Sequence, residues 1–273
     1  MLEIDAWPQL RDPVLVIALQ GWVDAGDAGM LAATTVAGQL EGTRVFARYE
    51  LGDLLDLAQT RPRVEIDNGA TRKIIWPTIE FSAGKSGRDV IVCVGPEPSL
   101  QWQTFAKELT ELFVRLGVGY ACTLGGIPTL SSHRRPISVL SVAGSPELAE
   151  EIHAVPRDYE GPIGVQTVLQ LALAEAGVPA VGLWAQVPHY VAGNPSPPAV
   201  RALLVRLAEL TGVRLDLTRI DEQVDGYTRA IEEGLSERPD VAQLVQAIED
   251  EEPPDAVSGD VLAEEIERFL RGQ

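Results

Sequence analysis

The chain has 273 residues and 45% of them are hydrophobic, so it is long and apolar enough to bury a large core. Its formal net charge of −18 excludes nucleic acid and anionic membrane surfaces as partners, because phosphate contact needs a basic face. No apolar run reaches the length of a membrane span and the acidic N-terminus does not look like a secretory signal, so we expect a cytoplasmic protein.

Short apolar strands alternate with amphipathic helices over the first 215 residues. In chain order the sequence predicts a strand at 14–20, a helix at 24–40, a strand at 45–49, a hairpin of 64–67 with 72–76, a strand at 89–95, a helix at 99–116, strands at 119–124 and 137–142, helices at 146–153 and 164–176, a strand at 179–185 and a helix at 195–210. This alternation is typical of an α/β fold with a mostly parallel sheet covered on both faces. Asn68-Gly69 marks the hairpin, which we expect at an edge of the sheet, making the sheet mixed.

Residues 216–273 differ from the rest of the chain in charge and in pattern. They carry 17 acidic and 5 basic side chains, whereas residues 1–215 carry 23 and 17. Strand signals stop here, and residues 221–235, 240–248 and 259–270 predict helices. We therefore expect two parts: an α/β body, 1–215, and an acidic helical C-terminal extension, 216–273. The apolar stripe of the extension would pack either on the body or on another subunit.

Loops rich in glycine or proline follow four of the predicted strands, at residues 21–27, 95–98, 125–128 and 186–190. In an open parallel sheet such loops lie along one edge, where ligands bind, so the sequence predicts a crevice there. Alternatively, the glycines and prolines only end the strands. Trp22 and Trp102 stand beside these loops and are either core or contact surface. The crevice residues would be Gly21, Trp22, Asp24, Gly95, Glu97, Trp102, Gly125, Gly126, Arg134 and His189.

The first of these loops partly matches the sequence motif of a nucleotide-binding phosphate loop. Gly21 and Gly26 have the required spacing, but Asp27 and Ala28 stand where lysine and serine or threonine are needed. An aspartate at a helix start satisfies the free N–H groups itself and repels phosphate. We therefore exclude nucleotide binding through this loop, and we expect no cofactor.

The sequence predicts no metal site. His133, His153 and His189 lack the spacing of zinc ligands. Cys93 and Cys122 lie in apolar runs without the CxxC pattern, so we interpret them as small buried side chains of a reducing compartment.

We assign no catalytic residue from the sequence. If the chain is an enzyme, the candidates are two loop histidines, His133 and His189, and two carboxylates, Asp24 and Glu97. A histidine paired with a carboxylate would form a hydrolase-like relay, with Arg134 as an anion clamp. However, the GxSxG motif of a nucleophile elbow is absent.

Six short motifs, in this order, resemble the bacterial, actinobacterial-type branch of the proteasome assembly chaperone-two family, over residues 14–217. They are Gly21-Trp22-Val23-Asp24-Ala25-Gly26, Arg61-Pro62 before Asp67-Asn68-Gly69, Gly95-Pro96-Glu97-Pro98 with Trp102, His133-Arg134-Arg135-Pro136, Tyr159-Glu160-Gly161-Pro162 and Val187-Pro188-His189-Tyr190. The resemblance implies a three-layer α/β/α fold like that of nucleoside phosphorylases and peptidyl hydrolases, and homo-oligomers. It also implies a binding or assembly role without established catalysis, on proteasome subunits in archaeal and eukaryotic relatives. The tail Phe269–Gln273 lacks the penultimate tyrosine with which some archaeal relatives dock.

Two functions follow from these observations. The first is a non-catalytic, oligomeric binding protein with a role in protein-complex assembly, with protein partners and other copies of the chain as ligands. The second is a small-molecule hydrolase or phosphorylase-like enzyme that uses the strand-end crevice.

Overall fold

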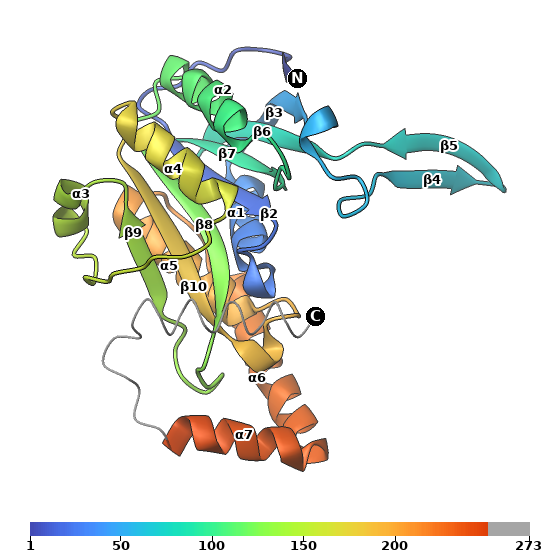
Figure 1. The fold of residues 1–273 in the computed structure, drawn as a ribbon, viewed down its shortest axis with the longest axis vertical. Coiled ribbons are helices and arrows are strands. Elements are labelled where there is room, and N and C mark those ends of the chain that lie inside the picture. Colours follow the sequence, from blue (N-terminus) through green and yellow to red (C-terminus); the bar gives the residue numbers. More distant parts are fainter. Residues whose placement is uncertain (251–273) are drawn as a thin grey trace.

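The strand β2 (Val14–Gln20) lies at the centre of an eight-stranded sheet in the computed structural model, which describes residues 1–250 (Figure 1). The order of the strands is β1-β3-β6-β7-β2-β8-β10-β9. The central strands β7, β2, β8 and β10 run parallel, and the outer strands pair antiparallel. The other strands of this sheet are β1 (Leu2–Ile4), β3 (Glu41–Glu50), β6 (Thr78–Lys85), β7 (Asp89–Pro96), β8 (Tyr120–Thr129), β9 (Val139–Ala143) and β10 (Ala180–Pro188).

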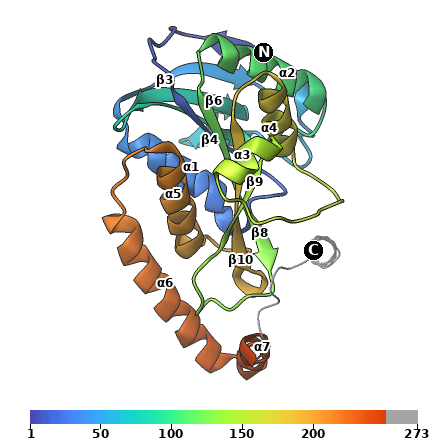
Figure 2. The same cartoon turned by 90° about the vertical axis from the view of Figure 1, so that its left-hand side faces the viewer.

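Helices cover both faces of the sheet, which gives three layers (Figure 2). Their bounds are α1 (Ala28–Gln39), α2 (Trp102–Arg115), α3 (Pro146–Glu151), α4 (Val165–Glu175), α5 (Pro197–Thr211), α6 (Thr218–Glu237) and α7 (Pro239–Asp250), with short 3-10 turns at Ala25–Asp27, Gly52–Leu54 and His189–Val191. Because side chains alternate along a strand, Val14 and Val16 of β2 pack towards α1 and α5, whereas Leu15 and Ile17 pack towards α2 and α4. The predicted α/β class is confirmed, as are the helices predicted at 221–235 and 240–248, which correspond to α6 and α7.

The structure corrects three details of the predicted sheet. Two strands, β1 and β6, were not predicted, although β6 shows the half-buried alternation of a strand against a core. Several strands are longer than predicted. As a result Gly125 and Gly126 lie inside β8, and not in a loop after it.

The hairpin is present where it was predicted, but its place in the fold differs. Strands β4 (Arg63–Asp67) and β5 (Ala70–Ile75) form a separate two-stranded sheet, and do not make an edge of the main one. Asn68 and Gly69 both have positive φ, 49° and 77°, as the tight turn requires. The hairpin projects from the body (Figure 1).

Helices α6 and α7 lie at one end of the body and form the described part of the C-terminal extension (Figure 1). The extension is fastened at its start, because the Gln39 side chain donates to the Asp216 carbonyl at 2.9 Å and accepts from its N–H at 2.7 Å. The helix predicted at 259–270 lies outside the described residues. Within residues 1–250, no helix is long and apolar enough to cross a membrane.

Candidate functional site

The carboxyl ends of β2, β8 and β10 bring their loops into direct contact, as the parallel order predicts. The loop after β2 lies on β8, where Asp24 and Gly126 form an isolated parallel bridge. It also meets the segment after β10, since the Gly26 N–H donates to the Ala192 carbonyl at 2.8 Å and its carbonyl accepts from the Ser196 N–H at 2.9 Å. The strand ends thus form one connected loop cluster.

Glycines allow this close approach. A Cβ atom on Gly126 would lie 2.2 Å from the Ala25 carbonyl oxygen, and one on Gly125 would lie 2.5 Å from the Val23 carbonyl oxygen. At Gly29, on α1, a Cβ would lie 2.3 Å from the Leu124 carbonyl oxygen. Backbone therefore packs against backbone where the sequence predicted a crevice. A Cβ on Gly95 would also clash, 2.7 Å from Ile79 on β6.

Glu97 fastens two of the loops to each other. Its carboxylate accepts the Trp22 N–H through Oε2 at 3.1 Å and the Val165 N–H through Oε1 at 2.7 Å. Val165 is the first residue of α4, where a carboxylate satisfies an unpaired N–H and favours the helix dipole. Gly21 leaves the room for it, because a Cβ there would lie 2.1 Å from Glu97 Oε2.

Asp24, and not Asp27, supplies the carboxylate that binds the free N–H groups at the start of α1. Its carboxylate accepts the Gly29 N–H at 2.6 Å and the Met30 N–H at 3.3 Å. Asp27 stands at the N-cap position with a left-handed backbone, φ 49°, and makes no side-chain capping bond. Burial raises the pKa of Asp24 to about 6, against the opposing effect of the two N–H bonds.

His133 and Arg134 lie in the loop after β8 and hold the C-terminal extension. The Arg134 guanidinium binds both carboxylate oxygens of Glu232, at 2.6 and 2.8 Å, and one of Glu249 at 2.9 Å. The His133 ring lies 2.7 Å from the Tyr190 hydroxyl and 3.1 Å from Glu232. Arg134 therefore is an anion clamp, but the anions it binds are carboxylates of α6 and α7.

The remaining candidates take part in packing. Trp102 donates from Nε1 to the Pro98 carbonyl at 2.6 Å and packs against the core under α2. Trp22 packs against a small cluster that contains Trp184. The His189 ring contacts Tyr190 edge-on, with centroids 5.6 Å apart.

Three of the four candidate catalytic groups, Asp24, Glu97 and His133, bind separate partners. Asp24 and Glu97 bind backbone N–H groups of the loop cluster, whereas His133 binds a tyrosine and a glutamate. Such contacts position loops, and a proton relay would need these groups to bind one another. Within residues 1–250 there is no cluster of histidine, cysteine and carboxylate side chains that could hold a metal ion.

Two features of the structure were not predicted from the sequence. The first is the pair Glu232 and Glu249, whose signal was the acidic extension together with the basic loop His133-Arg134-Arg135. The second is the apolar face of the hairpin, defined by Val64, Ile66, Ile74 and Trp76, whose exposed fractions are 53, 63, 51 and 56%. Val64 and Ile74 are cross-strand partners, so they share one face, and Ile66 follows two residues on.

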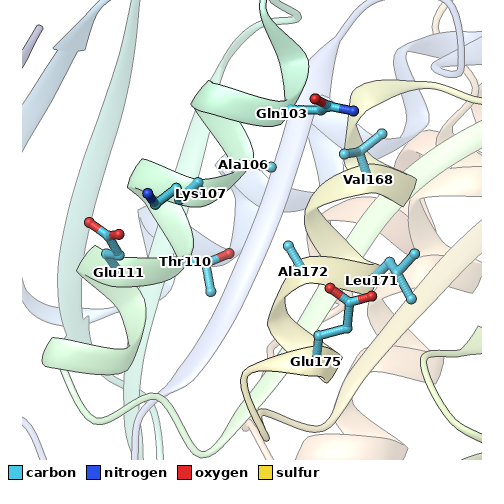
Figure 3. A pocket seen from close by; sticks show the side chains of 9 residues that line it. All are labelled: Gln103, Ala106, Lys107, Thr110, Glu111, Val168, Leu171, Ala172 and Glu175. Carbon is cyan, nitrogen blue, oxygen red and sulfur yellow. The ribbon is translucent and has the colours of Figure 1, made fainter.

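A hollow of about 360 Å³ lies on the outer surface between α2 and α4. Side chains of both helices line it, among them Lys107, Thr110, Leu171 and Glu175 (Figure 3). None of the predicted crevice residues lines this hollow.

Solved structures give the chain close relatives. A PAC2 family protein from Streptomyces avermitilis is 38% identical, with a TM-score of 0.78 over 86% of this chain and 100% of that one. A proteasome-assembly chaperone homologue from Mycobacterium tuberculosis is 34% identical, with a TM-score of 0.78 over 85% and 99%. A protein of unknown function from the same organism is 30% identical, with a TM-score of 0.82 over 92% and 87%. No curated protein matches.

The PAC2 family model matches residues 18–235, which is most of the chain. The six motifs therefore indicated the correct family, and the relatives from Streptomyces and Mycobacterium agree with the actinobacterial-type branch. The chain belongs to the PAC2 family.

Proposed function

We propose that this protein is a non-catalytic, homo-oligomeric binding protein that assists the assembly of a protein complex, in the manner of proteasome assembly chaperones. The observation that carries the proposal is the apolar face of the hairpin β4–β5. Four large apolar side chains there are more than half exposed, and no third strand within residues 1–250 pairs with the hairpin. An isolated two-stranded hairpin is only marginally stable in water, so a further surface on this face would stabilise it.

A second copy of the chain fits this face by charge. The residues from Arg61 to Lys73 carry four basic and two acidic side chains, whereas the whole chain has a net charge of −18. The hairpin of one copy is therefore attracted to the acidic surface of another. The apolar face supplies the contact area between two copies, and the basic residues around it favour the association of the two copies.

The assembly role is supported by family membership and by the M. tuberculosis relative that is described as a proteasome-assembly chaperone homologue. The contacts of the loop cluster also support a non-catalytic role, because its carboxylates and glycines hold loops together. The alternative, a crevice hydrolase, would need His133 or His189 to pair with Asp24 or Glu97.

Sedimentation velocity over a range of concentrations tests the oligomer. We expect the wild type to sediment as an oligomer and the double variant Ile66→Thr/Ile74→Thr as a monomer, because threonine keeps the strand preference and removes the apolar face. The matched control is Glu65→Thr/Lys73→Thr, a cross-strand pair on the opposite face, which should remain oligomeric. A wild-type monomer, or an oligomer in all three proteins, would contradict the proposal.

A further inference from the structure

The loop after β8 binds the C-terminal extension with four consecutive side chains. Arg134 binds a carboxylate of α6 and a carboxylate of α7. Ser132 donates to Glu249 Oε1 at 2.8 Å, and Arg135 donates from Nη2 to the Glu249 carbonyl at 3.0 Å. The His133 ring lies 3.1 Å from a carboxylate oxygen of α6. We call these four residues the clamp loop: Ser132, His133, Arg134 and Arg135.

The clamp loop is held in shape by bonds that do not involve the extension. The hydroxyl of Tyr190, in the turn after β10, accepts the His133 N–H at 2.8 Å. Within the loop, Ser132 accepts the Arg134 N–H through Oγ at 3.2 Å and the Arg135 N–H through its carbonyl at 3.1 Å. The loop is therefore pre-organised for the carboxylates that it binds, which lowers the entropy cost of binding them.

The extension, in contrast, buries few side chains. In α6 only Ile220 is buried, and in α7 only Val245 and Ile248. A single residue, Arg238, separates the two helices, and its backbone is not helical, with φ −128° and ψ 77°. A change of these two angles would swing α7 away from the clamp loop while α6 stays in place.

Long-range charge also opposes the docked position of the extension. Residues 216–273 carry 17 acidic and 5 basic side chains and residues 1–215 carry 23 and 17, so both parts are negative and repel each other. The attraction at the clamp loop is local and acts against this repulsion. The docked form thus depends on the clamp loop, and a ligand that competes for the loop shifts the population towards the released form.

The ion pairs of the clamp loop are better suited to recognition than to stability. The side chains of Arg134 and Glu232 are 42 and 41% exposed, and ion pairs in contact with water contribute little to stability. A guanidinium that binds both oxygens of one carboxylate nevertheless selects carboxylates by its geometry.

The structure itself contains the kind of ligand that the clamp loop selects. Glu232 and Glu249 come from two helices of an acidic segment, and each offers a carboxylate to Arg134. We propose that the clamp loop is a docking site for an acidic helical segment of a partner protein, and that the extension of the chain itself covers the site until such a segment displaces it. The clamp loop shares no residue with the hairpin, so this docking site is independent of the contact proposed between copies.

Fluorescence anisotropy tests this docking site with the full chain and a fluorescein-labelled peptide of residues 229–250, which carries both Glu232 and Glu249. We expect saturable binding that weakens with added salt, because the contacts are between charges. Arg134→Ala in the chain should weaken binding by about tenfold or more, since it removes the bidentate contact. Glu232→Gln/Glu249→Gln in the chain should tighten binding by about threefold or more, because it weakens the cover.

The matched control in the chain is Glu222→Gln/Glu233→Gln, which removes the same charge from the extension. Both residues are exposed on α6, whereas the clamp loop binds Glu232 and Glu249. The control should bind the peptide as the wild type does. A gain in affinity that is confined to Glu232→Gln/Glu249→Gln then belongs to the cover and not to the lower net charge.

Three results would overturn the proposal. The first is the absence of saturable binding by both the wild type and Glu232→Gln/Glu249→Gln at about 1 mM chain. The second is equal binding by the wild type and Arg134→Ala with both proteins folded by circular dichroism, which would place the peptide elsewhere. The third is equal binding by the wild type and Glu232→Gln/Glu249→Gln, which would show that the extension does not cover the site.

A further result would assign the site to a second copy of the chain. If the extension of another copy is the true ligand, the bound fraction of peptide falls again at high wild-type concentration, and the proposal of a partner protein is overturned. None of these results changes the outcome of the sedimentation test of the hairpin, so failure of the docking site and failure of the proposed function are distinguishable.

Discussion

Glu97 connects parts of the chain that are far apart in sequence. Its carboxylate joins the loop after β2 to the start of α4 through two backbone N–H groups. Glu97→Gln removes the charge and replaces one acceptor by a donor, so we expect a loss of roughly 1–3 kcal/mol in the free energy of unfolding. Urea denaturation measures this loss. The exposed variant Glu111→Gln is the control and should change stability by less than about 0.5 kcal/mol; equal stability of both variants would show that Glu97 does not hold the loops.

Two glycines of α1 provide a matched pair of substitutions. Gly29→Ala would place a Cβ atom 2.3 Å from the Leu124 carbonyl oxygen, and we expect it to cost about 1–3 kcal/mol or more as α1 moves away from β8. Gly38→Ala meets no atom within 4 Å and should stabilise the chain by about 0.5 kcal/mol. The melting temperatures of the two variants, measured by thermal unfolding, test this difference. If both variants have the same melting temperature, the close packing of α1 on β8 is not required.

At this scale the sequence predicted local contacts better than distant ones. Asp24 caps a helix that begins a few residues later, so the cap could be inferred from residue type and position. The partners of Glu97 lie 75 and 68 residues away, and no local pattern points to them. The same holds for Arg134, whose clamp was expected to take an external anion but binds carboxylates 98 and 115 residues further along.

Helices α6 and α7 are fastened to the body by the loop after β8. Arg134 binds a carboxylate on each helix, and Ser132 donates to Glu249 at 2.8 Å. We expect Arg134→Ala to release α7, because it leaves both carboxylates without their shared cation. Hydrogen exchange should show lost protection in α7 and unchanged protection in β2. The control is Arg229→Ala, whose guanidinium donates to the Asp225 carbonyl of its own helix at 3.2 Å. Unchanged exchange in Arg134→Ala would refute the clamp.

The clamp also predicts a pH dependence. Hydrogen bonds from Arg134 lower the pKa of Glu232 from 4.5 to about 2, and the pKa of Glu249 is lowered as well, chiefly by the hydrogen bond from Ser132. A carboxyl group whose pKa is lower in the docked form stabilises that form above its ordinary pKa, and the contribution is lost as the pH falls towards the lowered value.

We therefore expect the clamp to hold α6 and α7 at neutral pH and to weaken as the pH falls below about 4.5, over a range that extends to about pH 2 for Glu232 on α6. The chemical shifts of α7 amides in nitrogen-15 spectra would follow this change. In Arg134→Ala the shifts should already be those of released helices at pH 7. A transition centred above pH 5 in the wild type would assign the dependence to other groups.

Among the elements, type was easier to predict than length and partner. The Asn68-Gly69 turn predicted that a hairpin forms, but it did not predict where the hairpin lies. The hairpin lies outside the main sheet and its apolar face is exposed, whereas in an edge strand of the sheet that face would be buried. Strand β8 continues through Gly125-Gly126 because β10 pairs with it as far as Thr129, and this pairing is tertiary. The predicted boundary between body and extension, at residue 215, stays a prediction.

The whole molecule presents surfaces of opposite character. The body and the extension are acidic overall, whereas the hairpin is locally basic and has an apolar face. Hairpin and extension leave the body at different places (Figure 1), so under the proposed function the hairpin of one copy would contact the acidic surface of the next copy. Such head-to-tail contacts close into rings when the rotation between copies allows it.

Reconstitution of a proteasome core particle from its separately purified α and β subunits tests the proposed function most directly. We expect the wild-type chain to bind a subunit or an assembly intermediate and to raise the rate of core-particle formation, as measured by native mass spectrometry. We expect Ile66→Thr/Ile74→Thr to lose this effect and Glu65→Thr/Lys73→Thr to keep it. An unchanged rate together with no complex between the wild-type chain and any subunit would contradict the proposed function.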